Sequence, residues 1–532
     1  MEFRYAISLV YEAHLPFVRE FSKENDLSQK GEEGCFFQLI SETLLPLLEV
    51  LNRLENDQVP FRLALAISPV LCHMLNDEYL QKKYLHYVDK QIEFGRQELE
   101  RTSNGEIYKL VMSYYNQIVD RRIAFTERYE KNLLKAFESF RRKGRLEILG
   151  SSATYAYLPL ISHNPESLQA QMEVPASVYR RYFGGTPHGF WLPAFGWSSA
   201  LQPYLKAYNY TYTILESHGL LFGNPAPAKG CFYPAKTPNG TFIFAKDLYA
   251  AHDIKKAATD ELYRNNDRDA GYELPPELVS PFLSVDGERQ RTGYKYWSRI
   301  NSNMENSHNI YNPQAASDRV VKHTRTFLEN TIARLEEASK YMDEIPISIN
   351  AYNAGSFGHS WYEGTQFIET LFRMACEYKD IRFVSLSEYL FKQETSSIQV
   401  ITPELSSSGV NGYTESWLDA SNDWIYRHMF RAMERMTELA ERFPDDTGLK
   451  ERALNQAARE ILLAQSSDWP AFLHNQNSKE YARYKAEISL RNFTTIYEAL
   501  GSNYISTEWL TTLERKHNVF PNINYRVFRR KK

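Results

Sequence analysis

Short runs rich in β-branched and aromatic residues recur along this chain and alternate with long segments of helical spacing. Parallel strands need long crossover connections, so this alternation is typical of a parallel sheet or (β/α) barrel. Several of the runs end in polar residues, and the carboxyl ends of the strands build the active site in a parallel barrel. The predicted strands are residues 3–10, 61–67, 145–149, 189–192, 210–215, 241–245, 346–350 and 381–386.

The 532 residues are too many for one compact core, so we expect more than one domain. Residues 77–145 lack proline and have helical spacing, which predicts a helical insertion between two strands. Residues 216–345 are less regular, and a Ser, Thr, Pro and Gly-rich linker lies near 393–412. We therefore expect an α/β fold, with the barrel formed by residues 1–76 and 146–400 and the insertion by 77–145. A C-terminal helical bundle follows over 401–532, with helices at 417–443, 449–464, 478–500 and 507–517.

Composition excludes several classes of function. Lys and Arg (62) and Asp and Glu (66) are interspersed, so no basic surface for nucleic acid is expected, and the basic residues at 526–532 are interpreted as a solvated chain end. The four cysteines are too few and too far apart for a disulfide framework. The start lacks the features of a signal peptide, and no apolar run approaches ~18 residues, so we expect a soluble, cytoplasmic protein without a membrane partner. No metal-binding or phosphate-binding motif is present, and no cofactor is expected.

Five ordered segments are the candidate functional motifs: 13–17, 153–160, 188–197, 351–359 and 464–469, the last preceded by 417–428. On these segments the chain resembles glycoside hydrolase family 57, and within it the group of 1,4-α-glucan branching enzymes and similar α-amylases. The resemblance covers almost the whole length. It implies an incomplete (β/α)7 barrel with a helical insertion and a C-terminal helical domain, in agreement with the strand and helix pattern.

The resemblance also implies cleavage of α-glucosidic bonds with retention, which needs two carboxyl groups about 5 Å apart. The family nucleophile is a glutamate in the third motif and the acid/base an aspartate in the fourth. This chain has Ala194 and Asn353 at those positions. A methyl group cannot form a glycosyl ester, and an amide cannot give up and recover a proton. We therefore expect a catalytically degenerate relative, although the family itself implies an enzyme.

An engineered inactive variant would carry the same two changes. Neighbouring motif positions also depart from the family: Glu12 and Tyr155 stand where histidines are usual, Gly355 replaces a glutamate and Ser360 a tryptophan. An inactivating design rarely rebuilds its surroundings, so natural divergence is the preferred interpretation.

Other motif positions that line or support the cleft in active relatives keep sugar-compatible side chains. Histidine and aspartate can hydrogen-bond hydroxyl groups, and tryptophan can stack on sugar rings, although the same residues can also pack the barrel mouth. The predicted substrate-binding residues are His14, Trp191, His218, His359, Trp361, Trp424, Asp468 and Trp469.

The sequence leaves three functions open. The first is a degenerate branching-enzyme homologue that binds α-glucan, such as glycogen or maltooligosaccharide, alone or with enzymes of glycogen metabolism. The second is an active branching enzyme or hydrolase that uses a rewired carboxylate, with Glu12 as the candidate and Glu216 and Glu363 nearby in the motifs. The third is a structural or protein-interaction scaffold.

Overall fold

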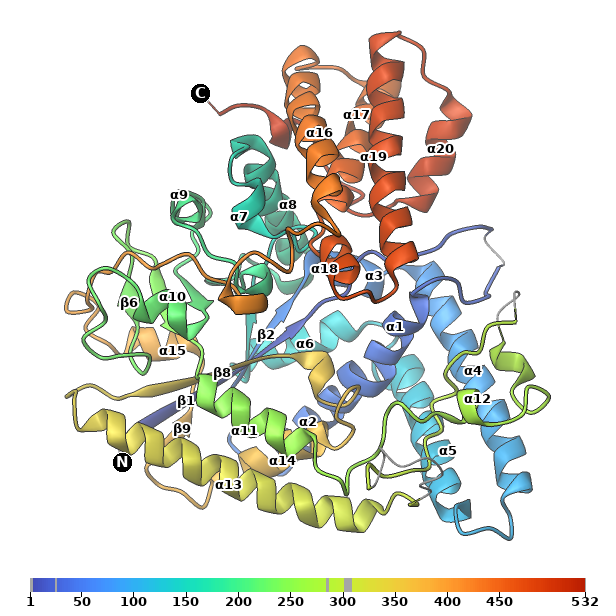
Figure 1. Ribbon diagram of the computed structural model, residues 1–532, viewed down its shortest axis with the longest axis vertical. Coiled ribbons are helices and arrows are strands. Elements are labelled where there is room, and N and C mark those ends of the chain that lie inside the picture. The colour runs from blue at the N-terminus through green and yellow to red at the C-terminus, as the bar shows by residue number, and fades with distance from the viewer. Residues whose placement is uncertain (1–2, 24–25, 284–286, 301–308, 532) are drawn as a thin grey trace.

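A computed structural model describes residues 3–23, 26–283, 287–300 and 309–531 (Figure 1). Every predicted strand segment contains a strand, with shifted ends. Strand β6 was not predicted. The strands are β1 Tyr5–Ala13, β2 Leu63–Ile67, β3 Leu146–Leu149, β4 Gly189–Phe190, β5 Tyr212–Leu215, β6 Ala235–Lys236, β7 Phe242–Ala245, β8 Ile347–Asn353 and β9 Ile381–Phe383.

The strands form two sheets that lie side by side and together make a barrel. One sheet has the order β3-β2-β1-β8, with β9 also paired to β1, and the other has the order β4-β5-β7-β6. Gly150 bridges to Phe190 in parallel and so continues β3 toward β4. On the other side the Asp247 amide, just after β7, donates to the Ile349 carbonyl of β8 at 2.8 Å. All pairings except β6 with β7 are parallel, which confirms the predicted fold class.

The barrel interior is filled by side chains from the inward faces of its strands. These buried residues form one apolar cluster, separate from the larger core between strands and helices. Because small alanines alternate with bulky residues, the side chains fill the interior as a packed core. The strand residues of this cluster are Ala6, Val10, Ala64, Ala66, Leu149, Tyr212, Ile214, Phe244, Ile347, Ile349 and Ala351.

Helices surround the barrel. Those before β3 are α1 Glu33–Gln38, η1 Leu39–Leu44, α2 Leu45–Asn56, α3 Pro69–Leu75, α4 Glu78–Arg101, α5 Tyr108–Ile123, η2 Ala124–Arg128 and α6 Leu133–Arg142. Those that follow are α7 Leu158–Ile161, α8 Pro165–Phe183, α9 Gln202–Ala207, α10 Ser217–Leu221, α11 Leu248–Ala258, α12 Ala270–Glu273, α13 Pro313–Ser339, α14 Gly364–Ala375 and α15 Leu386–Phe391. Helices α4, α5 and α6 occupy the segment predicted as an insertion, and α4 and α5 extend away from the barrel (Figure 1).

The continuous helical run Glu33–Asn56 corrects one sequence expectation. Taken as a whole, it is long and apolar enough to cross a membrane, although no such run was expected. Most of it is buried, and α2 packs on α14. A core helix of a soluble protein passes the same test of length and composition.

Helix α13 (Pro313–Ser339) is the longest helix described and lies in the segment that was expected to be irregular. The Asn312 side chain caps it by accepting from the amides of Gln314 and Ala315, and Pro313 occupies its first turn. Its apolar face packs on α14 and α11.

The C-terminal region is helical. Helices α16 Asp423–Arg442, α17 Gly448–Ala464, α19 Lys479–Gly501 and α20 Thr507–Lys516 agree with the predicted bundle, and the short α18 Asp468–His474 was missed. The helices stand together above the barrel in Figure 1, with α17 packed on α19.

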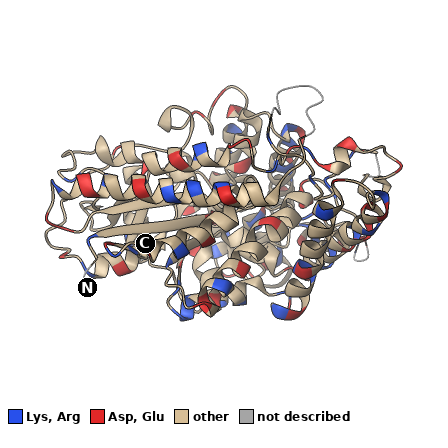
Figure 2. Cartoon of the chain, turned by 90° about the horizontal axis from the view of Figure 1, so that it is seen from below, with Lys and Arg blue, Asp and Glu red and all other residues tan. Residues whose placement is uncertain are grey.

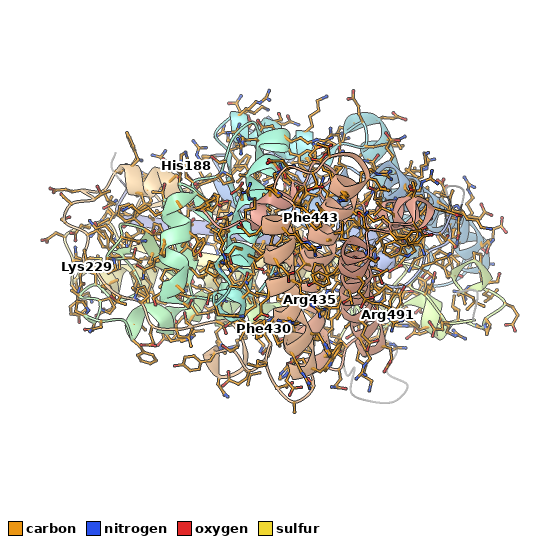
Figure 3. All side chains as sticks on the ribbon, turned by 90° about the horizontal axis from the view of Figure 1, so that it is seen from above. His188, Lys229, Phe430, Arg435, Phe443 and Arg491 are labelled. Carbon is orange, nitrogen blue, oxygen red and sulfur yellow. The ribbon has the colours of Figure 1, made fainter. Side chains whose placement is uncertain are left out.

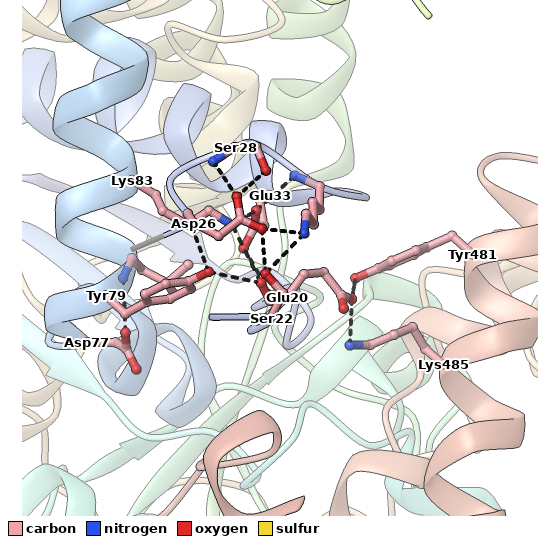
Figure 4. Close-up of polar contacts among 12 residues, drawn as sticks. Glu20, Ser22, Asp26, Ser28, Glu33, Asp77, Tyr79, Lys83, Tyr481 and Lys485 are labelled. Atoms are coloured by element: carbon pink, nitrogen blue, oxygen red, sulfur yellow. Dashed lines mark hydrogen bonds and ion pairs between the residues drawn. The ribbon is translucent and has the colours of Figure 1, made fainter. Parts of the chain in front are cut away.

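The loop after β1 ties this bundle to the insertion (Figure 4). The Glu20 carboxylate accepts from Lys485 and Tyr481 of α19, both at 3.1 Å. The Glu20 amide donates at 3.0 Å to Glu33, the first residue of α1. Glu33 pairs with Lys83 of α4, and both side chains are almost fully buried. Burial raises the pKa of Glu33, an effect that Lys83 opposes. Removing either partner of such a pair leaves an uncompensated buried charge.

Basic and acidic residues are interspersed along the elements seen from below in Figure 2. The side chains of Arg530 and Lys531 at the basic chain end are 75% and 63% exposed, as expected of a solvated end, and the segment is also held by ion pairs. Arg526 pairs with Glu451 at 3.2 Å, and Lys531 pairs with Glu173 at 3.0 Å.

Candidate active site

The carboxyl ends of β1 and β8 bring Glu12 and Asn353 side by side. The two residues are directly opposite each other in the parallel ladder. The Asn353 side-chain amide donates to Glu12 Oε2 at 2.9 Å, and its carbonyl oxygen accepts from the Gly355 amide at 2.8 Å. Both polar atoms of Asn353 are therefore engaged within the protein.

Glu12 is a buried carboxyl group whose Oε1 is shielded from solvent. It is 4% exposed, and its Oε1 has no hydrogen-bond partner among the described residues. Burial raises the pKa of Glu12 to about 7, and His14, Asn353 and Tyr155 offset part of this effect. Glu12 therefore changes its protonation state near neutral pH.

His14 connects the barrel to the C-terminal region. Its Nδ1 lies 2.8 Å from Ser68 Oγ at the end of β2, and its Nε2 lies 2.9 Å from Asp468 Oδ2 at the start of α18. Its ring stacks on that of Tyr155 with centroids 3.9 Å apart. Both ring nitrogens and one face are thus occupied, which fixes the imidazole in place.

Tyr155 lies between the strand ends and the turn after β4. Its hydroxyl oxygen accepts from the Trp191 indole at 3.3 Å and from the Ala194 amide at 3.5 Å. Its backbone carbonyl accepts from the Ser467 hydroxyl at 2.6 Å. Burial raises the pKa of Tyr155 well above its ordinary value, so the phenol is protonated.

Ala194 occupies a strained turn. Ala194 and Phe195 have φ angles of 54° and 52°, and Tyr155 has 57°. The left-handed region costs a non-glycine residue roughly 1–2 kcal/mol, and such outliers concentrate at functional sites. The Ala194 carbonyl is held by the amide and the hydroxyl of Ser408, at 2.8 and 3.0 Å. The backbone of this turn is therefore maintained around a side chain that is only a methyl group.

Glu12, His14, Tyr155, Ala194 and Asn353 are joined through these contacts into one cluster at the barrel mouth. Comparison with known proteins gives the scaffold a family. The pattern described as Glycosyl hydrolase family 57 matches residues 8–255, and that described as the C-terminal part of 1,4-alpha-glucan branching enzyme matches residues 428–528. The α-amylase AmyC of Thermotoga maritima is 32% identical, with 99% of this chain and 100% of that chain covered at a TM-score of 0.92. The chain belongs to glycosyl hydrolase family 57.

Two further family 57 proteins extend the comparison. A 1,4-alpha-glucan branching enzyme of Thermococcus kodakarensis is 25% identical, with 97% of this chain and 77% of that protein covered. The branching enzyme of Pyrococcus horikoshii shares the fold, with a TM-score of 0.88 at 24% identity over 99% of this chain and 97% of that chain. The family resemblance inferred from the five motifs is confirmed.

In this family 57 chain, three of the predicted binding tryptophans are almost fully buried. Trp191, Trp361 and Trp469 are 3%, 2% and 1% exposed. Trp361 packs against Tyr263, and the Trp469 indole donates to the Leu463 carbonyl at 2.9 Å. In this conformation their rings are packing surfaces. Trp424 is partly exposed and lies beside Trp469 in an apolar cluster.

The predicted binding histidines lie in two different surroundings. His218 Nε2 is 2.8 Å from the Gly412 carbonyl, in the same loop as Ser408, so it adjoins the Ala194 turn. His359 contacts Glu42 of the neighbouring helical layer at 2.5 Å. The pKa of Glu42 is lowered, because Lys295 and His359 more than offset the effect of its burial. His359 therefore contacts the helical layer through Glu42.

The other two candidate carboxylates also have structural partners. Glu216 pairs with Lys246 at 3.1 Å, and Glu363 accepts from the backbone amide of Arg264 at 3.0 Å. Burial raises the pKa of Glu363. Of the three candidate carboxyl groups, Glu12 is thus the one that lies in the cluster around Asn353.

Sequence reasoning missed Ser68 and Ser408. Ser68 could have been found, because it follows a predicted strand and precedes Pro69 as a helix cap. Ser408 lies in the segment interpreted as a linker, and nothing in its composition indicates that it folds back on the turn of Ala194.

Proposed function

We propose that this chain is a catalytically degenerate homologue of 1,4-alpha-glucan branching enzymes that binds α-glucan at the barrel mouth. The observation that carries the proposal is the methyl side chain of Ala194 on a strained turn beside Tyr155. The family resemblance implies the nucleophile at this position. An alanine there removes the covalent step, while the shape of the turn is retained.

Asn353 supports the same proposal. Its two polar atoms are engaged with Glu12 and the Gly355 amide, and an amide cannot serve as a proton donor that is later restored. Trp424 offers the partly exposed aromatic surface for a sugar ring. We also propose that the protein acts in the cytoplasm, in the metabolism of α-glucans.

Isothermal titration calorimetry with maltoheptaose and glycogen tests binding. We expect saturable heat with the wild-type protein and roughly tenfold weaker binding in Trp424→Ala, which removes a stacking surface. Trp509→Ala on α20 is the matched control and should bind like the wild type. Absence of heat at millimolar ligand would exclude glucan binding and favour a scaffold for other proteins, such as enzymes of glycogen metabolism.

A second candidate function rests on Glu12 itself. A carboxyl group with a pKa of about 7 at the carboxyl ends of two barrel strands has the protonation properties of a general acid. An enzyme of this kind would cleave or branch amylose with a rewired carboxylate. Turnover by the wild type that disappears in Glu12→Gln would establish it, and no turnover by the wild type would exclude it.

A further inference from the structure

A groove runs between α16 and α19 on the C-terminal bundle; we call it the α16–α19 groove. It encloses about 550 Å³. Its lining residues recur at intervals of four, three and four on both helices, so each helix presents one face to it. Each stripe covers roughly 16 Å of helix axis. The stripes are Trp424, His428, Arg431 and Arg435 on α16, and Glu487, Arg491, Thr494 and Glu498 on α19.

The two stripes run in the same direction. The Arg483 guanidinium lies over the Trp424 ring at 5.6 Å, near the start of both helices. Farther along, the Arg435 guanidinium lies over the Tyr497 ring at 4.8 Å. Figure 3 shows Arg435 and Arg491 on the neighbouring helices. The α16–α19 groove therefore runs between two parallel helices.

Two buried donors of the groove have no partner within the part of the chain that the structure describes. They are Arg435 Nε and the Trp424 indole nitrogen. Both nitrogens are shielded from solvent, but the side chains of Arg435 and Trp424 are partly exposed, so a ligand in the groove can reach the other donors of Arg435 and the ring of Trp424. Glu487 and Glu498 add acceptors on the facing helix.

The charges of the lining favour a neutral polar ligand. Three arginines stand beside two glutamates, and Arg431 already pairs with Glu434 at 2.8 Å. Both donors and acceptors line the groove, and an aromatic ring lies at one end. Such a lining matches the hydroxyl groups and ring faces of a carbohydrate better than a polyanion.

One end of the groove adjoins the candidate active site. Trp424 belongs to the same apolar cluster as Trp469. The preceding residue, Asp468, contacts His14 at 2.9 Å. A glucan chain that leaves the barrel mouth beside His14 would therefore reach the α16–α19 groove.

We propose that the α16–α19 groove is a second binding surface, which holds the part of a long α-glucan chain outside the barrel mouth. This proposal rests on the proposed function. It adds that the protein binds long glucan chains along a second surface beyond the barrel mouth. Arg435 and Arg491 donate to sugar hydroxyls there, and Glu487 and Glu498 accept from them.

The test compares short and long chains. Calorimetry is done with maltotriose and with amylose on the wild type, Arg435→Gln, Arg491→Gln and the control Arg442→Gln. Arg442 ends the same helix outside the groove, with its guanidinium over Phe443. We expect the two groove variants to bind amylose on the order of tenfold more weakly and maltotriose unchanged, with Arg442→Gln like the wild type. Arg435→Lys, which keeps the charge but loses the planar donors, should resemble Arg435→Gln.

Three results would overturn the proposal for the groove. If each of the four proteins bound maltotriose and amylose with equal affinity per glucan molecule, the groove would be excluded. Glucan binding at the barrel mouth would remain supported. Amylose affinity that falls equally in Arg442→Gln would show a general effect of charge. Absence of binding by either glucan to the wild type would reject the proposed function and the groove together. Circular dichroism and thermal midpoints confirm that each variant is folded.

Discussion

Replacing Glu12 by Gln should change how the stability of the protein depends on pH. The pKa of Glu12 rises from 4.5 in the unfolded chain to about 7 in the folded protein, because the carboxyl group is buried. Below about pH 4.5 both states hold the proton, and the group carries no penalty. As the pH rises toward 7, the unfolded chain loses its proton first, so the folded state loses stability. Above about pH 7 the penalty is constant.

The size of the effect follows from the shift. Each pKa unit corresponds to about 1.4 kcal/mol, so Glu12 costs the folded state roughly 3 kcal/mol above neutral pH. Gln cannot ionise but can still accept from Asn353. Glu12→Gln should therefore gain about 3 kcal/mol relative to the wild type between about pH 4.5 and pH 7.5.

Urea unfolding of both proteins across this range measures the difference. Subtracting the two curves removes the contributions of other titrating groups. The control is Ser152→Ala, because Ser152 is buried and its hydroxyl has no partner in the described part of the chain. Its difference from wild type should be independent of pH. A flat difference for Glu12→Gln as well, or one of opposite sign, would refute the protonation state assigned to Glu12.

Three further predictions concern the scaffold. Lys83→Ala should lose about 3–5 kcal/mol of unfolding free energy, because it leaves Glu33 buried and unpaired, and a loss below about 1 kcal/mol in urea unfolding would contradict this. Ala194→Gly should gain roughly 1 kcal/mol by relieving the left-handed backbone, and a lower thermal midpoint would show that the turn is not strained. His14→Ala should expose α18 to hydrogen exchange, because it removes the contact with Asp468, and unchanged protection would refute that role.

The strand pattern could be predicted because each barrel strand is a short run bounded by turn residues, as β1 and β8 illustrate. Helix α13 could not be separated from its irregular surroundings, although Asn312 and Pro313 signal its start. The ion pairs at the chain end could not be predicted either. The contacts of Arg526 and Lys531 join residues far apart in the sequence.

The sequence nominates the residues of the candidate site but only part of their arrangement. Motif order identified Glu12, Ala194 and Asn353, and the register of β1 with β8 explains why two of them meet. Neither the burial of Trp361 nor the partner of His359 could be inferred, because both depend on how the helical layer packs against the barrel. The raised pKa of Glu12 likewise depends on its burial in the fold.

The central claim is tested most directly by incubating the wild-type protein with amylose under conditions in which calorimetry shows binding. New reducing ends and new 1,6 linkages are then measured in the wild type and in Glu12→Gln. The account predicts neither product above the level of a heat-inactivated control, since Ala194 cannot form the covalent intermediate. Turnover by the wild type that disappears in Glu12→Gln would contradict the account and make Glu12 a catalytic residue.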